Sequence, residues 1–347
     1  MKPFLRVLVV SAVGVSALAL TGSALAAFTT PKLSITNTAA GLTVGYTQVK
    51  DDDALNRLTI YMPTGYAASL AAAPGSTVGS VTSVVQANAI SADALVPLNG
   101  TIRVDSPTAA THNEPLDVAC RGGVAANAVW VLVLQSPTGP LEVPVYVIAI
   151  TSGPEAAFAS GKLVLCLPSP YIPTSAGGAA LGAKVINAQM TIQGVFTAPT
   201  AAGEYRWRGI ATPYTVGSGA PNAVGTVELQ ATQAVPGGRV SIASRRRGKT
   251  VTISGRVTSG GSSVAGAPVQ IFRGARVVKT VRTSASGAYS YTVRLRRGGY
   301  TFSARATVPA RDLGAAGCAT AISAAPCIDA TASGFRAQSA VVRVRVR

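Results

Sequence analysis

The sequence predicts an all-β protein with two sandwich-type domains behind a secretory signal peptide. After the signal segment, apolar residues rarely recur at the 3.6-residue spacing of a helix. Short runs rich in Val, Ile, Thr and Tyr recur instead, between clusters of Gly, Pro, Asn and Ser. The charge changes abruptly near residue 235, which indicates a domain boundary between segments 27–235 and 236–347.

The segment 1–26 has the pattern of a secretory signal peptide. Two basic residues stand at its head, an apolar run covers 7–20, and Ala24 and Ala26 mark a cleavage site. The run is shorter than the ~20 residues that span a bilayer, which disfavours the alternative of a retained anchor. No later segment has the length and apolarity of a transmembrane span, so we expect a bacterial protein that is secreted or held at the cell surface.

Segment 27–235 carries no motif of a recognised family and is predicted to form a β-rich domain. Its candidate strands are 32–37, 42–49, 55–62, 80–87, 101–106, 128–136, 142–151, 161–167, 188–198, 204–214 and 224–233. Asn99-Gly100 lies between two apolar runs and predicts a two-residue hairpin turn, with Pro97 on an edge strand. Asn99 also begins a glycosylation sequon, but the turn is the favoured interpretation.

Three consecutive aspartates at 51–53 raise the alternative of a calcium site. Calcium needs several convergent oxygen ligands, and nothing nearby in the sequence completes the set. A solvated turn is therefore expected.

Four cysteines in an exported chain predict two disulfides. Three pairings are possible, and the spacing favours Cys120 with Cys166 and Cys318 with Cys327, because each pair then stays inside one domain. A zinc site is disfavoured, since no two cysteines are separated by two residues. We expect no metal and no cofactor.

His112 is the one histidine and stands near Glu114 and Asp117. A scattered Ser-His-Asp triad would make this segment the site of a secreted hydrolase. Zinc peptidase, serine-elbow and phosphate-loop motifs are all missing from the sequence, so no catalytic residue is assigned. The favoured interpretation of His112 is a polar loop residue.

The stretch "EYRWRG" alternates Tyr205 and Trp207 with Arg206 and Arg208. Such a surface can stack on a sugar or a base. In an alternating strand, however, aromatic residues more often fill the core, and this is the expectation here.

The candidate strands of segment 250–308 alternate between apolar and polar residues, which is typical of a sheet buried on one face. The apolar positions are Val251, Ile253, Val257, Val269, Ile271, Tyr289, Tyr291, Val293, Leu295, Tyr300, Phe302 and Ala304. The closing stretch 342–347 continues the pattern with alternating Val and Arg, so we expect a last strand with a dry valine face.

The sequence of this segment resembles that of carboxypeptidase regulatory-like, transthyretin-like β-sandwich domains. The resemblance rests on Gly255, Val257, the Gly266–Val269 turn, Gly287, Tyr289 and Gly299-Tyr300. It covers about 236–308 and, with the last strand, extends to 347; bacterial immunoglobulin-like repeats resemble the segment nearly as well. The resemblance implies a sandwich fold and says little about function. Ala285-Ser286 departs from the pattern, and an insertion at 309–334 is expected to form a loop held by Cys318 and Cys327.

The charge distribution supplies the one functional hypothesis. Segment 27–234 holds nine Lys and Arg against eleven Asp and Glu, whereas segment 235–347 holds nineteen against two. A basic domain of this kind is expected to bind an anionic partner, foremost a cell-wall polymer or acidic glycan, with lipid headgroups or extracellular DNA as alternatives. No sequence-specific binding of nucleic acid is expected. The alternatives are a bias in composition and a purely structural spacer. The residues expected to bind the anion are Arg294, Arg296, Arg305, Arg343, Arg345 and Arg347.

Overall fold

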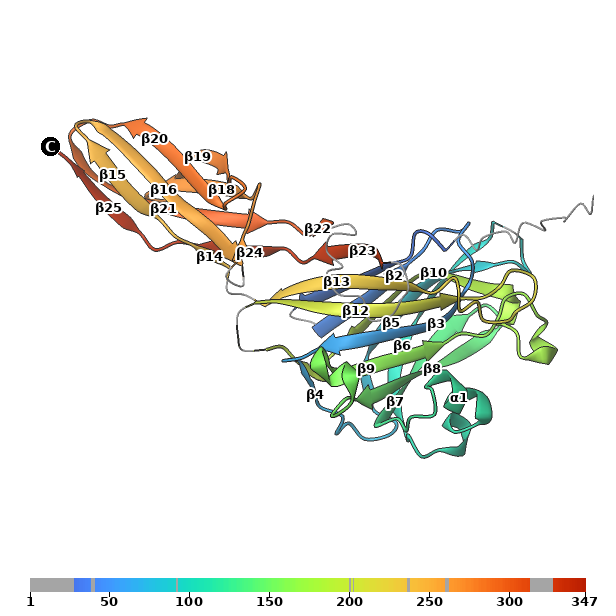
Figure 1. Cartoon of the computed structure of the whole chain (residues 1–347). Coiled ribbons are helices and arrows are strands. Elements are labelled where there is room, and N and C mark those ends of the chain that lie inside the picture. The colour runs from blue at the N-terminus through green and yellow to red at the C-terminus, as the bar shows by residue number, and fades with distance from the viewer. Residues whose placement is uncertain are drawn as a thin grey trace, which may run out of the picture.

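The computed structural model describes residues 28–38, 41–91, 93–199, 201, 203–235, 238–259, 262–312 and 327–347. The predicted signal peptide 1–26 and Cys318, half of the second predicted disulfide, lie outside the described residues. Within the described part the protein is all-β, as predicted (Figure 1).

Most strands belong to one 13-stranded sheet. In spatial order the strands are β1 (Lys32–Thr38), β2 (Gly41–Thr47), β10 (Ala183–Ile192), β5 (Thr77–Ala87), β6 (Leu95–Asp105), β7 (Ala128–Ser136), β8 (Gly139–Ala149), β9 (Ala159–Cys166), β3 (Leu55–Pro63), β12 (Gly203–Pro213), β13 (Val227–Val235), β23 (Cys327–Ala332) and β22 (Arg311–Asp312). Neighbours run antiparallel except β13 and β23. A two-stranded sheet, β4 (Ala67–Ala68) with β11 (Phe196–Thr197), accompanies it.

The large sheet curls, so that β1 packs against β13 near the other end of the strand order. A single apolar cluster fills the inside and includes the fully buried Trp207 and Ile102. The opposing walls that the sequence predicted as a sandwich are therefore parts of one continuous sheet. We call this curled sheet the large domain.

The predicted turn at Asn99-Gly100 is wrong. β6 runs unbroken through both residues and pairs with β5 on one side and β7 on the other. Gly100 is required for a different reason, since a Cβ there would lie 1.9 Å from the carbonyl oxygen of Val133. Pro97 is accommodated because β7 begins to pair only at Asn99, so the missing N–H breaks no ladder on that side.

The solvated turn predicted at 51–53 is also wrong for two of its three aspartates. Asp52 and Asp53 are buried, and the carboxylate of Asp52 accepts hydrogen bonds from the backbone N–H groups of Thr29 (2.8 Å) and Thr30 (3.3 Å). Lys184 donates to the carbonyl oxygen of Asp52 (2.8 Å). This polar cluster fastens the first described residues to the large domain.

The second region is a β-sandwich that extends away from the large domain (Figure 1). In one sheet, β16 (Thr250–Ser259) pairs with β14 (Arg239–Val240), β15 (Ala243–Arg247), β17 (Ser262–Ser263) and β20 (Ala288–Arg294). The other sheet has the order β19 (Arg276–Arg282), β18 (Pro268–Arg273), β21 (Gly298–Val308) and β24 (Phe335–Gln338), with β25 (Val342–Val346) also on β21. Val251, Ile253 and Val257 are completely buried between the sheets, so the predicted alternation is confirmed.

The insertion at 309–334 does not remain a simple loop of the sandwich. Its described parts form β22 and β23, and β23 adds to the large domain as a parallel neighbour of β13. Ser333 continues this contact, because its backbone N–H donates to the carbonyl oxygen of Thr232 and its hydroxyl to that of Ile35 (3.1 Å). Hydrogen bonding therefore crosses the boundary placed near residue 235, and the division into domains stays a prediction.

Helices are few and short among the described residues. They are α1 (Pro115–Cys120) and the 3-10 turns η1 (Ala110–His112), η2 (Pro154–Ala157), η3 (Thr174–Ala176) and η4 (Ala180–Gly182). None of these helices has the length and apolar character of a membrane span.

Candidate anion-binding surface

The free end of the sandwich is built from two turns and the C-terminus. The β15–β16 turn and the β20–β21 connection lie side by side, because Thr250 pairs with Arg294 and the backbone N–H of Leu295 donates to the carbonyl oxygen of Lys249 (2.8 Å). The C-terminal strand joins them, since Val346 pairs with Gly298. Figure 1 shows this end pointing away from the large domain.

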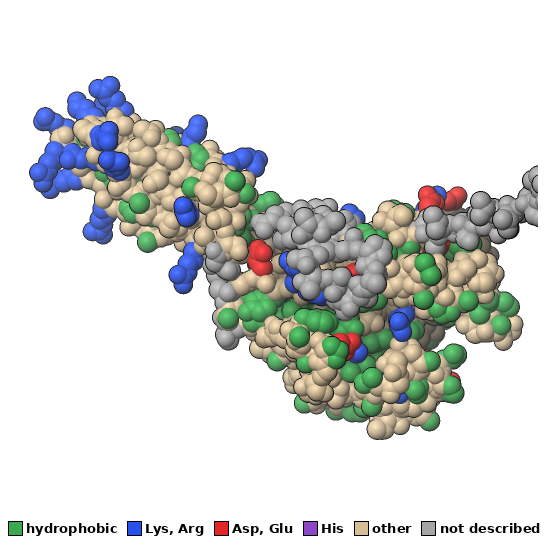
Figure 2. All heavy atoms as spheres, in the orientation of Figure 1, with side chains coloured by type: hydrophobic (Ala, Val, Ile, Leu, Met, Phe, Trp, Pro, Cys, Tyr) green, Lys and Arg blue, Asp and Glu red, His purple; other side chains and the backbone are tan. Residues whose placement is uncertain are grey.

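Nine exposed Lys and Arg side chains gather at this end, which we call the cationic tip (Figure 2). Its members are Arg245, Arg246, Arg247, Lys249, Arg294, Arg296, Arg297, Arg345 and Arg347. Buried apolar residues hold the backbone beneath them: Leu295 is 5% exposed and Val346 is 2% exposed. The positions of the charges are therefore fixed by the core of the sandwich.

No carboxylate side chain neutralises the cationic tip from within the sandwich. Residues 238–308 and 335–347 contain no Asp and no Glu. Side chains two residues apart on one strand are separated by about 7 Å, which is less than the Debye length of about 8 Å at physiological ionic strength. The tip therefore presents overlapping positive potentials to an approaching anion.

Two exposed glycines make a shallow depression in the cationic tip. It is lined by Arg297, Gly298, Gly299, Arg345, Val346 and Arg347. At Gly299 no atom lies within 4 Å of the place a Cβ would occupy, so an anionic group can approach the backbone between the flanking guanidinium groups.

The six arginines predicted from the sequence do not form one surface. Arg294, Arg296, Arg345 and Arg347 belong to the cationic tip, with Arg294 and Arg345 on strands of opposite sheets. Arg343 lies on β25 two residues before Arg345, opposite Thr301, and so lies behind the tip.

Arg305 lies apart from the tip. It is seven residues from Gly298 along β21, or about 23 Å, and its guanidinium lies 5.0 Å from the ring of Phe272 and donates to Gln338 (3.1 Å). Arg305 is thus a side-chain contact of the sheet rather than a member of the tip.

Sequence reasoning missed five members of the tip, namely Arg245, Arg246, Arg247, Lys249 and Arg297. A local signal was present: "RRRGK" and "RLRRGG" both place a basic run against a glycine, which marks a turn between strands. Strand pairing brings the two turns together at one end of the sandwich. Neither run alone predicts this.

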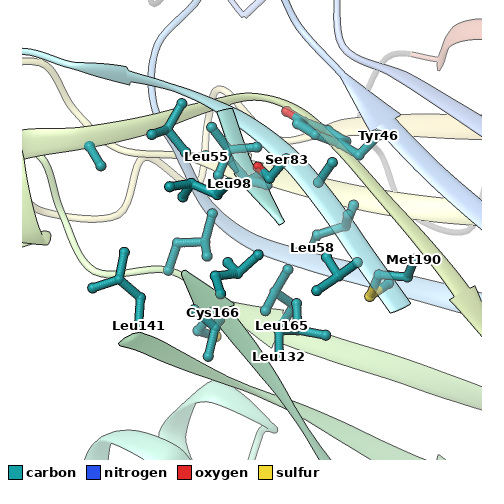
Figure 3. Close-up of a pocket in the computed structure, with 18 of the residues that line it drawn as sticks. Tyr46, Leu55, Leu58, Ser83, Leu98, Leu132, Leu141, Leu165, Cys166 and Met190 are labelled. Carbon is teal, nitrogen blue, oxygen red and sulfur yellow. The ribbon is translucent and has the colours of Figure 1, made fainter. Parts of the chain in front are cut away.

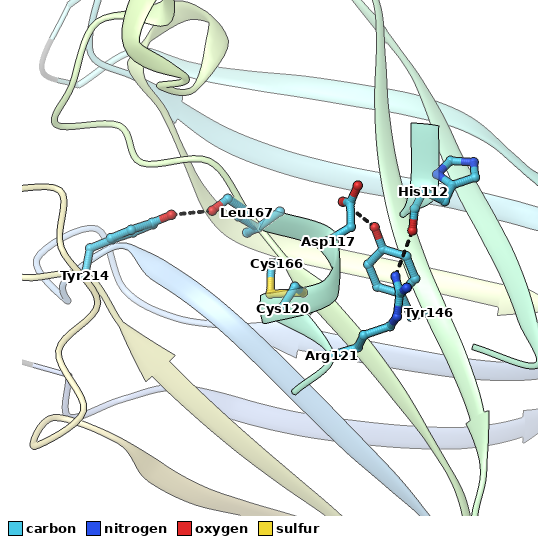
Figure 4. The surroundings of a disulfide bond; sticks show 8 residues. All are labelled: His112, Asp117, Cys120, Arg121, Tyr146, Cys166, Leu167 and Tyr214. Atoms are coloured by element: carbon cyan, nitrogen blue, oxygen red, sulfur yellow. Dashed lines mark hydrogen bonds between the residues drawn. A yellow bond between two sulfur atoms is a disulfide. The ribbon is translucent and has the colours of Figure 1, made fainter. Parts of the chain in front are cut away.

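His112 lies in the large domain, far from the cationic tip in sequence, and is 8% exposed. Its Nε2 lies 3.0 Å from Oδ2 of Asp105, and its carbonyl oxygen accepts a hydrogen bond from Arg121 (2.7 Å; Figure 4). Nδ1 has no hydrogen-bond partner among the described residues. The described part of the chain therefore brings together a His–Asp pair without a hydroxyl nucleophile in hydrogen-bonding distance.

Several contacts that join different elements lie near His112. A disulfide joins Cys120 at the end of α1 to Cys166 on β9, as the spacing predicted (Figure 4). Beside it, the guanidinium of Arg121 lies 5.2 Å from the ring of Tyr146, whose hydroxyl donates to Asp117 (2.5 Å). Burial, together with the bond to Asp117, raises the pKa of Tyr146 well above its ordinary value. These contacts fasten the β6–β7 connection to the outside of the sheet.

The aromatic residues of "EYRWRG" face inward, as predicted. Trp207 is completely buried, and its ring packs edge-on against that of Tyr66 at 5.1 Å. No cluster of three His, Cys, Asp or Glu that would suit a metal ion occurs among the described residues.

No protein-family model matches the chain, the carboxypeptidase regulatory-like family included, and no curated protein matches it. Among solved structures, the D00-D0 domain of Intimin has 14% sequence identity and a TM-score of 0.19, covering 80% of this chain and 98% of that one. The D0-D1 domain of Intimin has 12% identity and a TM-score of 0.18, covering 60% and 88%. A protein from Corynebacterium diphtheriae described as membrane-anchored has 10% identity and a TM-score of 0.19, covering 88% and 53%.

Proposed function

We propose that this is a secreted or cell-surface bacterial binding protein whose cationic tip holds an anionic polymer, such as a cell-wall polymer or an acidic glycan. One observation carries the proposal: nine exposed cationic side chains from three separate segments gather at one end of a sandwich that has no carboxylate side chain of its own.

The geometry of the tip favours a polymer over a small ligand. The charges stand on an outward-facing end of the sandwich, and the depression at Gly298-Gly299 is shallow and open. A chain with regularly spaced charges can contact many such side chains in turn, whereas a single small anion can contact only a few. Recognition by charge alone gives affinity without sequence preference and a steep dependence on salt.

Stability alone does not account for this arrangement. Like charges on neighbouring strand positions repel, at a cost of a few tenths of a kcal/mol for each directly opposed pair. The exposed side chains of Arg345 and Arg347 add no burial that would offset the cost. A surface that disfavours folding slightly is consistent with selection for binding.

The test compares two triple variants of the mature protein that remove the same charge from different places. Arg297→Gln/Arg345→Gln/Arg347→Gln removes three charges from the cationic tip. Arg239→Gln/Arg256→Gln/Arg336→Gln removes three exposed charges near the other end of the sandwich, where Arg239 pairs with Thr258 and Arg336 with Thr307. Both proteins are applied to heparin and polyphosphate columns and eluted with a salt gradient.

We expect the tip variant to elute at clearly lower salt and the control close to wild type. In solution, the slope of log affinity against log salt should fall by about 2 for the tip variant, given about 0.7–0.9 for each charge contact in nucleic acids. Equal losses in both variants would show that net charge rather than the tip decides binding. Identical elution of all three proteins would favour the purely structural spacer.

A further inference from the structure

The large domain encloses a cavity of about 210 Å³ (Figure 3). Its wall includes Val81, Leu98, Leu132, Leu165 and Met190, from five different strands. Packed protein interiors contain few voids larger than a water molecule. A space of this size is large enough to hold a small apolar molecule.

The wall of the cavity offers almost no free polar group. The hydroxyl of Ser83 donates to the carbonyl oxygen of Asn187 (2.7 Å), and the hydroxyl of Tyr46 donates to Gln48 (2.6 Å). None of the buried unpartnered polar atoms found among the described residues belongs to the cavity wall. Ordered water needs two to four polar partners, so water is a poor occupant and hydrocarbon a good one.

The cavity reaches the surface where two strands of the sheet separate. β8 pairs with β9 only over Val145–Ala149, which leaves its first half without a partner on that side. The exposed Glu142 and Pro168 both line the cavity, one on each side of this opening. We call the gap between β8 residues 140–144 and residues 166–168 the slot.

Proline keeps the slot open. The backbone N–H of Ile150 donates to the carbonyl oxygen of Ser160 on β9. Because hydrogen-bonding direction alternates along a strand, the backbone N–H of every second residue before Ile150 also points to the β9 side. Pro140 and Pro144 stand at such positions, and neither has an N–H to donate. Closing the slot by strand pairing is thus disfavoured by the sequence of β8 itself.

From this cavity and slot we propose that the large domain binds the hydrocarbon part of a small apolar molecule, which enters between β8 and residues 166–168. A cavity of 150 Å³ in another protein holds benzene, so by proportion about eight carbons fit here. No Lys or Arg is among the described residues that line the cavity, so a carboxylate headgroup would find no cation to pair with there. A neutral molecule such as a medium-chain alcohol is the matching ligand class.

The test is titration of the mature full-length protein with 1-octanol, followed by calorimetry at several temperatures. We expect saturable binding at one site with a negative heat-capacity change, which marks burial of apolar surface. Octanoate should bind more weakly than octanol because no Lys or Arg of the described chain lines the cavity to pair with its carboxylate.

Two variants on one strand localise the site. Ala188 lines the cavity and Gln189 is exposed, so Ala188→Phe fills the cavity while Gln189→Phe places the same ring outside. We expect at least a ten-fold loss of octanol affinity for Ala188→Phe and none for Gln189→Phe. If Ala188→Phe does not fold, a xenon-bound crystal of the wild type decides the matter. The proposal is overturned if wild-type protein shows no saturable octanol binding and no xenon in the cavity, or if Gln189→Phe loses affinity equally.

Discussion

Both regions of this protein close β-strands around an apolar core, but their surfaces differ in charge. The large domain is nearly neutral, and its charged side chains pair with one another: Lys162 with Glu155 at 2.8 Å and Arg103 with Glu142 at 3.1 Å. The sandwich has no carboxylate side chain in 238–308 and 335–347, and nine of its cations gather at one end. Paired charges hold a domain together, whereas unpaired charges of one sign are available to a partner.

Their interiors differ as well. The sandwich core contains short alternating strands whose central residues, such as Ile271 and Ala304, are completely buried. The large domain wraps a longer sheet around a wider core and leaves an apolar cavity of about 210 Å³. A two-sheet sandwich closes by bringing two faces together, while a curled sheet must fill whatever space its curvature encloses. The proposed apolar ligand would lie inside one region, and the proposed polymer would bind outside the other.

The largest effect is expected from a substitution that unfolds the sandwich while the folding of the large domain is monitored. Val344 is 7% exposed on the dry face of β25, so Val344→Asp buries an unpaired carboxylate. We expect the sandwich to lose at least about 4 kcal/mol. Both tryptophans, Trp130 and Trp207, lie in the large domain, so their fluorescence should stay native. The sandwich strands should lose their protection from amide hydrogen exchange.

Val341→Asp is the matched control, since Val341 is 60% exposed next to the same strand. It should leave both regions folded. If Val344→Asp unfolds the large domain together with the sandwich, the two regions form one cooperative unit through β23.

Removal of the disulfide should affect the opposite region. Cys120→Ser/Cys166→Ser opens a loop closed across a sequence separation of 46, which is worth about 4 kcal/mol in the chain-entropy model. Thermal unfolding followed by tryptophan fluorescence should shift to lower temperature, while the protection of the sandwich strands from amide hydrogen exchange stays unchanged. An unchanged tryptophan transition would mean that α1 contributes nothing to the stability of the sheet.

Backbone crowding gives a smaller and more local contrast. At Gly100 an added Cβ meets the carbonyl oxygen of Val133, whereas at Gly299 it meets nothing within 4 Å. Gly100→Ala should therefore destabilise the large domain by about 1–3 kcal/mol, and Gly299→Ala should leave the sandwich unchanged. Chemical denaturation of both variants measures this difference; equal effects would show that neither position is set by close strand approach.

The smallest expected difference between the two regions is in how their folding stability depends on pH. The hydrogen bond with His112 lowers the pKa of Asp105. Burial by itself would raise the pKa of Glu155, but hydrogen bonds from Lys162 and Tyr61 lower it. A carboxyl with a lowered pKa in the folded state stabilises above its unfolded pKa of about 4, and this contribution is lost as pH falls further.

Asp53 acts in the other direction, because burial raises its pKa. We expect the tryptophan-detected stability of the large domain to fall below about pH 4, while the sandwich, which lacks carboxylate side chains, keeps its stability. A parallel fall in both regions would indicate that charge repulsion dominates over these pairs.

The all-β class, the faces of the sandwich strands and the pairing of Cys120 with Cys166 could all be predicted from the sequence. These follow from local periodicity and spacing: residues two apart in a strand share a face, so Val251 and Ile253 are fixed as core without knowledge of their partners. The same periodicity predicts that the side chains of Val344 and Val346 point into the core and those of the neighbouring arginines into solvent, as the structure shows.

Which strands lie next to one another could be learned from the three-dimensional structure alone. Gly100 matched a turn signal, yet a third strand packs directly on it and the chain runs straight through. Arg247 and Arg297 are fifty positions apart in the chain but share the cationic tip, and the slot depends on where β9 stops pairing with β8. Long-range pairing is set by the total burial of the curled sheet and the sandwich, and no local window of sequence contains that sum.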